Sequence, residues 1–179
     1  MIYVSEIQTT APKTFKNDLQ KKVYSELSSL SIPFERVDTD EVITMDDCVA
    51  VNEKLNMKMV KTLFLCNKQQ TDFYLFITVG DKPFRSKDFS NALNVARMSF
   101  SPSDLMETML GTKIGAATIL SALLPTANRV KIVIDKQVAD EEYYGCSDGT
   151  TTGYLKVKTT DIIYKFLAFT KRDYSIVTV

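Results

Sequence analysis

Two nearly uninterrupted apolar segments, residues 59–66 and 72–79, constrain the fold of this 179-residue chain more than any other feature. Five polar residues separate them, which is a length typical of a hairpin connection. Because neither segment alternates with polar residues, we expect both faces of the hairpin to be covered. Lys61 interrupts the first segment. An inward ammonium there would need a cavity or an anionic partner, whereas a lysine near the start of a strand can also reach solvent, and the sequence leaves both interpretations open.

Hydrophobic periodicity predicts further helices and strands around this hairpin. The predicted helices are 13–30, 45–55, 86–97, 101–110 and 159–167, with a helical turn over 119–124. The predicted strands are 2–4, 34–37, 129–135, 142–144, 153–157 and 174–179. Phe15 is expected to lie on the inner face of the first helix, and Val49, Ala50 and Leu55 on that of the second. Strands interleaved with helices predict an α+β fold, a single domain over residues 1–179 with a mixed central β-sheet and helices packed around it.

Composition excludes several classes of function. The chain has no histidine, which removes Ser-His-Asp and Cys-His catalysis and any histidine-ligated metal. Three cysteines lie far apart without C-x-x-C spacing, so neither a zinc site nor another metal site is expected, and no cofactor is indicated. No basic region followed by an apolar core opens the sequence, and no apolar run could cross a membrane, so we expect a cytoplasmic protein without a membrane partner. The formal net charge is zero, so a nucleic-acid partner would be held by a local patch.

Residues 110–118 are the candidate site loop. Gly111 is placed to end the helix 101–110, because glycine adopts the left-handed C-terminal conformation without a steric penalty. Gly115 then opens a run of small residues, Ala116, Ala117 and Thr118. Small side chains leave backbone N–H groups accessible to an oxyanion or a carbonyl. A helix cap followed by a tight turn explains the same residues, and the loop alone favours that simpler interpretation.

A second polar loop, residues 145–152, contains Cys146 and the run Thr150–Thr152. Cys146 could be exposed there, but no histidine is present to activate its thiol. A threonine hydroxyl would need an adjacent base, and none is visible in the sequence. These residues therefore predict a second wall of a site rather than a nucleophile.

Three segments, taken in order, resemble the YbaK-type aminoacyl-tRNA deacylases. This family includes free-standing prolyl-tRNA editing proteins and the editing domain inserted in bacterial prolyl-tRNA synthetases. Residues 60–65 resemble the strand that carries the family's essential lysine, and residues 110–118 resemble its glycine loop. Residues 145–156 resemble its His-Pro-x-x-Asn-Thr segment. Lys61 and both loop glycines are kept.

This sequence also departs from the family pattern. Ile119 stands where the glycine loop usually has proline, and Gly145, Cys146 and Gly149 stand at the usual histidine, proline and asparagine. These departures affect positions that shape the pocket. A non-catalytic relative that binds tRNA or an amino acid is therefore one alternative, and a partner-binding domain without an RNA role is another.

The resemblance implies a fold of the editing-domain type and a reaction. The reaction is hydrolysis of the ester that joins a wrong amino acid to tRNA, most often alanine on the proline-specific tRNA. The resemblance implies that Lys61 contacts the phosphate or carbonyl region of the substrate. It also implies that backbone N–H groups of Gly115 and Ala116 donate hydrogen bonds to the oxyanion. Substrate contacts are assigned in the same way to Thr62, Gly111, Ala117, Thr118, Ile119, Gly145, Gly149 and Thr150. The implied partners are mischarged tRNA and a prolyl-tRNA synthetase, not DNA.

Overall fold

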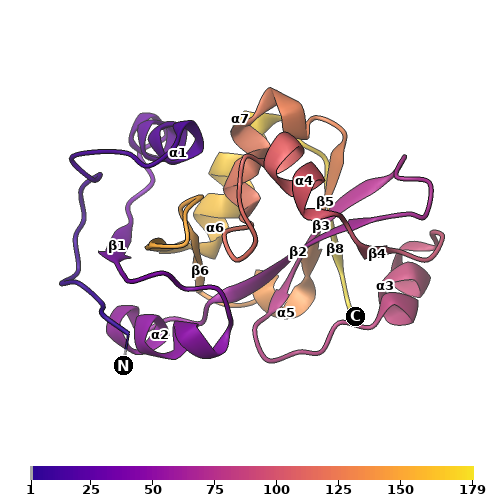
Figure 1. Cartoon of the computed structure of the whole chain (residues 1–179), viewed down its shortest axis with the longest axis horizontal. Coiled ribbons are helices and arrows are strands. Elements are labelled where there is room, and N and C mark those ends of the chain that lie inside the picture. Colours follow the sequence, from indigo (N-terminus) through magenta and orange to yellow (C-terminus); the bar gives the residue numbers. More distant parts are fainter. Residues whose placement is uncertain (1) are drawn as a thin grey trace.

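The computed structural model describes residues 2–179 and shows two β-sheets with helices packed around them (Figure 1). The larger sheet has the strand order β4 (Ser99–Phe100), β2 (Val60–Cys66), β3 (Phe73–Val79), β5 (Val130–Asp135), β8 (Tyr174–Val177). The smaller sheet has the order β1 (Glu35–Asp38), β7 (Gly153–Lys158), β6 (Tyr143–Ser147). A single bridge connects Met59, just before β2, to Gly145 in the middle of β6 and so links the two sheets. The predicted α+β class is confirmed, with the strands divided between two sheets.

The predicted hairpin forms the centre of the larger sheet. Strands β2 and β3 pair antiparallel over their whole lengths, with Lys61 opposite Thr78 and Phe64 opposite Leu75. Strand β5 adds parallel to β3 and β8 adds parallel to β5, so the sheet is mixed as expected. In the smaller sheet all pairs are antiparallel.

Helical segments cover both sheets. The α-helices are α1 (Asp18–Ser29), α2 (Val49–Leu55), α3 (Ser86–Leu93), α4 (Ser103–Leu105), α5 (Lys136–Ala139), α6 (Thr159–Asp161) and α7 (Leu167–Thr170). The 3₁₀ turns are η1 (Asp46–Cys48), η3 (Ile119–Leu123) and η4 (Pro125–Ala127), and the π turns are η2 (Met106–Leu110) and η5 (Ile162–Phe166). Within residues 2–179, every helix is too short or too polar to traverse a lipid bilayer.

Each face of the hairpin is buried, as its apolar sequence predicts. Phe64 and Leu75 belong to the main core, which also contains residues of α1, η3 and η5. Leu65 and Phe76 point to the other face and pack with Phe89 of α3. Figure 1 shows α3 at the opposite end of the molecule from α1 and α2. A third cluster, which includes Val51, Leu55 and Tyr154, lies between α2 and the smaller sheet.

Helix ends differ from the prediction because local capping overrides apolar spacing. Helix α1 begins at Asp18 rather than near residue 13, since the Asn17 side chain accepts a hydrogen bond from the N–H of Gln20. Phe15 therefore lies before the helix and is exposed. Helix α3 ends at Leu93 rather than at residue 97. The next residue, Asn94, takes a left-handed conformation with φ of 53° and so ends the helix.

Two other local predictions are corrected, and one helix was not predicted. Val49 is 55% exposed and Val51 is fully buried, so the inner face of α2 is displaced from the predicted one. Residues 2–4 form no strand; only a single bridge joins Val4 to Thr39. Helix α5, which the sequence analysis did not predict, begins after Asp135, whose side chain accepts a hydrogen bond from the N–H of Gln137.

Candidate functional site

A cavity of about 550 Å³ lies between the loop after η2, the start of α1 and the loop 148–152. We call it the glycine-loop cavity. Its lining residues are Lys16, Asn17, Glu41, Glu107, Gly111, Thr112, Lys113, Ala116 and Gly149–Thr152. The two loops singled out in the sequence thus meet at one cavity, although 26 residues lie between them in the chain. Its volume is within the range of small-molecule sites.

Glycines set the path of the first loop. Gly111 ends η2 with φ of 67° and Gly115 has φ of 88°, so both use the left-handed region that disfavours other residues. A Cβ at Gly115 would lie 3.0 Å from the Ile43 Cα. The N–H of Ala116 donates to the Lys113 carbonyl at 3.0 Å, which closes a tight turn. The cap-and-turn interpretation of this loop is therefore correct, and the turn also lines a cavity.

The loop residues that follow leave the cavity wall and enter the protein interior. Ala117 is half-buried, while Thr118 and Ile119 are fully buried. The Thr118 side chain accepts a hydrogen bond from the N–H of Leu120 at 3.3 Å and so caps η3. Ile119 packs in the main core. The structure thus separates Gly111 and Ala116, which line the cavity, from Thr118 and Ile119, which do not.

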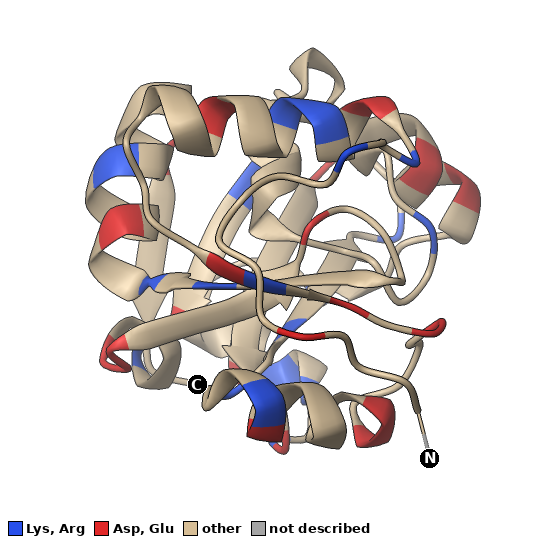
Figure 2. Cartoon of the chain, turned by 90° about the vertical axis from the view of Figure 1, so that its left-hand side faces the viewer, with Lys and Arg blue, Asp and Glu red and all other residues tan. Residues whose placement is uncertain are grey.

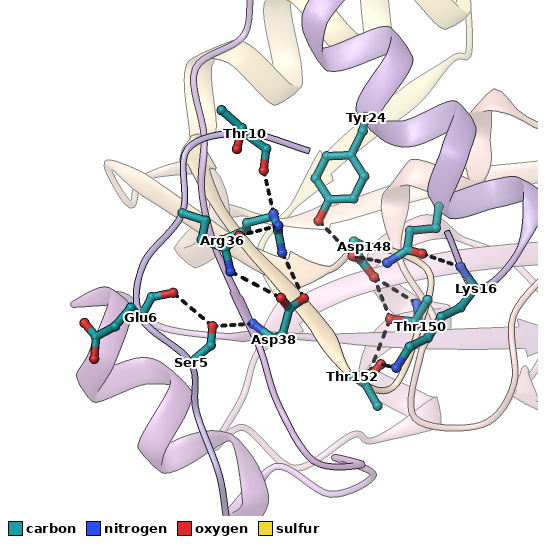
Figure 3. Close-up of polar contacts among 12 residues, drawn as sticks. Ser5, Glu6, Thr10, Lys16, Tyr24, Arg36, Asp38, Asp148, Thr150 and Thr152 are labelled. Atoms are coloured by element: carbon teal, nitrogen blue, oxygen red, sulfur yellow. Dashed lines mark hydrogen bonds and ion pairs between the residues drawn. The ribbon is translucent and has the colours of Figure 1, made fainter. Parts of the chain in front are cut away.

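A buried carboxylate holds the second loop against α1 (Figure 3). Asp148 is 0% exposed and accepts hydrogen bonds from the Gln20 side chain and the Tyr24 hydroxyl, both at 2.8 Å. It also accepts from the Thr150 hydroxyl at 2.7 Å and the Thr150 N–H at 3.2 Å. Burial, together with the Asp148 charge, raises the pKa of Tyr24. A Cβ at Gly153 would overlap the Asp148 carboxylate, so a glycine at position 153 leaves the space that this carboxylate occupies.

The start of α1 completes this wall. The Asn17 side-chain N–H donates to the Gly149 carbonyl at 3.0 Å, and the Lys16 ammonium donates to the Thr152 hydroxyl. Gly149 has φ of 99°, and a Cβ there would lie 3.0 Å from Leu19. Figure 2 shows basic and acidic residues mixed over this side of the molecule. Phosphate contacts would therefore come from individual lysines rather than from a broad basic surface.

Lys61 lies on the other face of the larger sheet. Side chains alternate along β2, and Thr62 shares the face of Phe64 in the main core, whereas Lys61 shares the face of Leu65. The Lys61 ammonium donates to the carbonyl of Lys82. Burial lowers the pKa of Lys61, and the nearby Asp81 charge acts in the opposite direction. The expectation that Lys61 and the glycine loop line one pocket is wrong for this conformation, because Lys61 is not among the residues that line the glycine-loop cavity.

Two further predicted residues also lie elsewhere. Half-buried Thr62 on β2 does not line the glycine-loop cavity. Gly145 is buried in β6, where a Cβ would overlap the Met57 side chain and approach the Lys58 carbonyl at 3.0 Å. At the position where the resembling family has histidine, a larger side chain would therefore have to displace Met57 and press against the Lys58 carbonyl.

A larger cleft of about 1040 Å³ lies near Lys61 on the α2 and α5 side. Lys82 lines it and forms an ion pair with Asp135 at 2.8 Å. Asp135 is 0% exposed and also accepts a hydrogen bond from the Thr78 hydroxyl at 2.7 Å. The Asp135 carboxylate accepts a hydrogen bond from the Lys82 ammonium, and the Lys82 carbonyl accepts one from the Lys61 ammonium. Lys61 is therefore part of a connected polar network.

Cys146 is not the exposed loop residue that the sequence suggested. It lies in β6, is 2% exposed, and burial raises the pKa of its thiol to about 12. A protonated, buried thiol is a poor nucleophile. Within residues 2–179, no group of three acidic, cysteine or histidine side chains is arranged to hold a metal ion.

Several residues of the site carry little distinctive signal in the sequence. Asp148 lies within a loop that the sequence identified, and its flanking glycine and threonine were the available signal. Glu107 and Lys113 lie next to the loop glycines but resemble ordinary surface charges in sequence. Lys16 and the N-cap residue Asn17 lie just before α1, and only the three-dimensional fold brings them to the loop at 149–152.

Comparison with known proteins decides the family. The profile of the aminoacyl-tRNA editing domain matches residues 39–164, well over half of the chain. The protein belongs to the aminoacyl-tRNA editing domain family. A curated relative, the prolyl-tRNA editing protein ProX of Acetoanaerobium sticklandii, is 23% identical over 150 residues, which cover 83% of this chain and 92% of that protein.

Solved structures support the editing-domain fold. The crystal structure of the hypothetical protein APE2540 has a TM-score of 0.68 and 14% identity, and the match covers 87% of this chain and 98% of that one. A proposed trans-editing enzyme for prolyl-tRNA synthetase has a TM-score of 0.65 and 12% identity, with 92% of this chain and 99% of that one covered. At these identities the likeness concerns the fold, and it agrees with the fold that the sequence resemblance implied.

Proposed function

We propose that this protein is a trans-acting deacylase that hydrolyses the ester of mischarged tRNA, with alanyl-tRNA(Pro) as its substrate. Family membership and the name of the curated relative support the reaction class. The observation that carries the proposal is the meeting of the loops 110–118 and 148–152 at the glycine-loop cavity. In this proposal the whole chain acts as one domain in the cytoplasm, with tRNA as its partner and prolyl-tRNA synthetase as an associated protein.

The proposed chemistry relies on the main chain and on the substrate itself. An ester on a ribose is already activated, so a positioned water molecule can attack it without a protein nucleophile. The N–H of Gly115 has no hydrogen-bond acceptor among residues 2–179, but Gly115 does not line the glycine-loop cavity, so the turn would have to shift before this N–H could bind the oxyanion. The N–H of Ala116 donates to Lys113 and would have to leave that turn before it could take part. One such donor is typically worth about 10²–10³ in rate, and a neighbouring ribose hydroxyl would orient the water.

Lys61 distinguishes two forms of this mechanism. The lysine-assisted form requires the Lys61 ammonium to leave the Lys82 carbonyl and to reach the ester from the opposite face of the sheet. The main-chain form requires no contact with Lys61, only a rearrangement within the turn 113–116, whose residues Lys113 and Ala116 already line the cavity. We expect the variant Lys61→Met to keep turnover within about tenfold of wild type. A loss of about 100-fold or more in a folded Lys61→Met protein would instead support the lysine-assisted form.

The experiment that tests the function is a deacylation assay with tRNA(Pro) charged with alanine, serine, cysteine or proline. We expect alanine to be removed fastest and proline to be excluded by size, because attraction alone discriminates by only about 1–3 kcal/mol per methylene. Equal rates on all four would contradict size exclusion. Binding of alanyl-tRNA without turnover would identify the non-catalytic alternative.

Paired variants locate the reaction. Thr151→Phe places a large ring on the wall of the glycine-loop cavity, whereas Val49→Phe places the same ring in the larger cleft. Thr151 is half-buried and Val49 is 55% exposed, so neither change affects a fully buried position. We expect Thr151→Phe to abolish turnover and Val49→Phe to retain it. The reverse result would move the site to the larger cleft.

A further inference from the structure

We infer that Glu107 selects substrates with a free α-ammonium group and that Lys113 contacts the terminal phosphodiester of the same ligand. This inference rests on the proposed function and specifies the class of acyl group that the glycine-loop cavity accepts. That class is an unblocked amino acid esterified to a nucleotide, as opposed to an N-acylated amino acid or a peptide.

The charges on the cavity wall are balanced but only partly satisfied. Lys16, Glu41, Glu107 and Lys113 all line the cavity. The Lys16 ammonium donates to the Thr152 hydroxyl, and the Glu41 carboxylate accepts from the Thr151 hydroxyl at 3.3 Å. By contrast, the side chains of Glu107 and Lys113 have neither a hydrogen bond nor an ion pair with any residue from 2 to 179.

A second observation at the same wall points to a ligand. Thr112 lies between these two charges in the chain, lines the cavity and is 2% exposed. Its hydroxyl is buried and has no hydrogen-bond partner within the described residues. Buried polar groups of this kind are rare in folded proteins and are usually paired with protein, water or ligand atoms. A ligand seated against the Gly111 turn would supply such a partner if the threonine side chain changed rotamer to face the cavity.

The unpaired charges define the ligand. A free phosphate would gain from Lys113 but would be repelled by Glu107, so a simple anion does not fit both. An aminoacyl ester carries its ammonium on the carbon next to the reacting carbonyl and its negative charge on the nucleotide backbone. A charge-assisted hydrogen bond from that ammonium to a carboxylate is roughly twice as strong as a neutral one, and N-acylation abolishes it.

Recognition of the amine is testable with matched substrates. Deacylation rates are compared for alanyl-tRNA and N-acetyl-alanyl-tRNA with wild type, Glu107→Gln and the control Glu142→Gln. Glu142 is exposed and lines neither of the two cavities. We expect wild type and Glu142→Gln to prefer the free amine by about 10- to 100-fold, and Glu107→Gln to prefer it by less than about threefold. An unchanged preference in Glu107→Gln would overturn the inference.

A binding measurement separates this inference from the proposed function. The probes are the non-hydrolysable amides 3′-alanylamino-adenosine and its N-acetyl form, titrated by calorimetry against the full chain. Wild type should bind the free amine more tightly than the N-acetyl form, and this difference should disappear in Glu107→Gln. Such a result supports the inference even if no tRNA is deacylated. The absence of deacylation would reject only the proposed deacylase activity. Equal binding of both probes by wild type would reject amine recognition whatever the deacylation assay shows.

The role of Lys113 has its own readout. Adding a 5′-phosphate or a preceding nucleotide to the probe should tighten binding in wild type by about tenfold, and by less in Lys113→Gln. Lys68→Gln, an exposed lysine at the far hairpin turn, serves as the control. A phosphate effect of the same size in Lys113→Gln would remove this residue from the site.

Discussion

The substitution Asp148→Asn tests whether the buried carboxylate holds the cavity wall together. In the native protein, one carboxylate oxygen accepts from Gln20 and Tyr24, and the other accepts from the hydroxyl and the N–H of Thr150. If the asparagine oxygen stays on Thr150, its amide N–H₂ faces Gln20 and Tyr24. The Tyr24 hydroxyl can rotate and accept, but the Gln20 side chain is fixed because its oxygen accepts from the N–H of Lys16 at 2.7 Å.

The expected cost follows from this geometry. A buried donor left without an acceptor costs about 1–3 kcal/mol, and the surviving bonds lose their charge-assisted part. We therefore expect Asp148→Asn to lower the free energy of unfolding by about 2–4 kcal/mol out of a typical 5–15 kcal/mol. With a urea m-value of about 2 kcal/mol/M, the midpoint should fall by about 1–2 M.

Two controls accompany this measurement. Tyr24→Phe removes one donor and leaves Asp148 with three hydrogen bonds, so a loss of about 1 kcal/mol is expected. Asp140→Asn removes a carboxylate that is 61% exposed and paired with Lys136, which is itself 57% exposed, so less than about 1 kcal/mol is expected. An Asp148→Asn protein whose free energy of unfolding lies within about 0.5 kcal/mol of wild type would refute the reasoning.

Two further predictions concern buried groups. Burial raises the pKa of the Cys146 thiol from 9.0 to about 12, so above pH 9 the unfolded chain releases a proton that the folded chain retains. The free energy of unfolding should therefore decrease between pH 9 and 12 by up to about 1.4 kcal/mol per pH unit, compared with the variant Cys146→Ala. Urea titrations at several pH values measure this difference. If the free energies of the two proteins changed with pH in parallel, the prediction would be contradicted. Gly149→Ala combines φ of 99° with a Cβ 3.0 Å from Leu19, and it should cost about 1–3 kcal/mol. Its melting temperature, measured by calorimetry, should fall by about 2–4 °C per kcal/mol, and an unchanged value would show that the loop relaxes freely.

Much of the fold follows from local patterns. The apolar hairpin, the helix from Asp18 and the strand ending at Asp135 were all predictable because burial of a continuous apolar surface dominates their energetics. Boundaries were less predictable because single hydrogen bonds decide them. Phe15 continues the four-residue spacing of α1, yet the Asn17 cap excludes it from the helix.

The loops that line the glycine-loop cavity could be identified from the sequence, but the placement of Lys61 outside it could not. Gly111 and Gly149 mark the two turns that meet, because a left-handed backbone limits the residue choice. Both faces of β2 are apolar, so alternation could not tell which face would meet the glycine loop. The resemblance assigned both Lys61 and Thr62 to the site, although neighbouring residues of a strand point to opposite faces.

The editing-domain match begins at residue 39, whereas α1 ends at Ser29. The fold shared with solved structures is nevertheless wider than this match, since the trans-editing structure covers 92% of the chain and so includes residues before 39. Lys16 and Asn17 line the glycine-loop cavity, and Gln20 of α1 holds Asp148 in place. A chain that began after Ser29 would therefore keep both glycine-bearing turns but lose the wall that faces them.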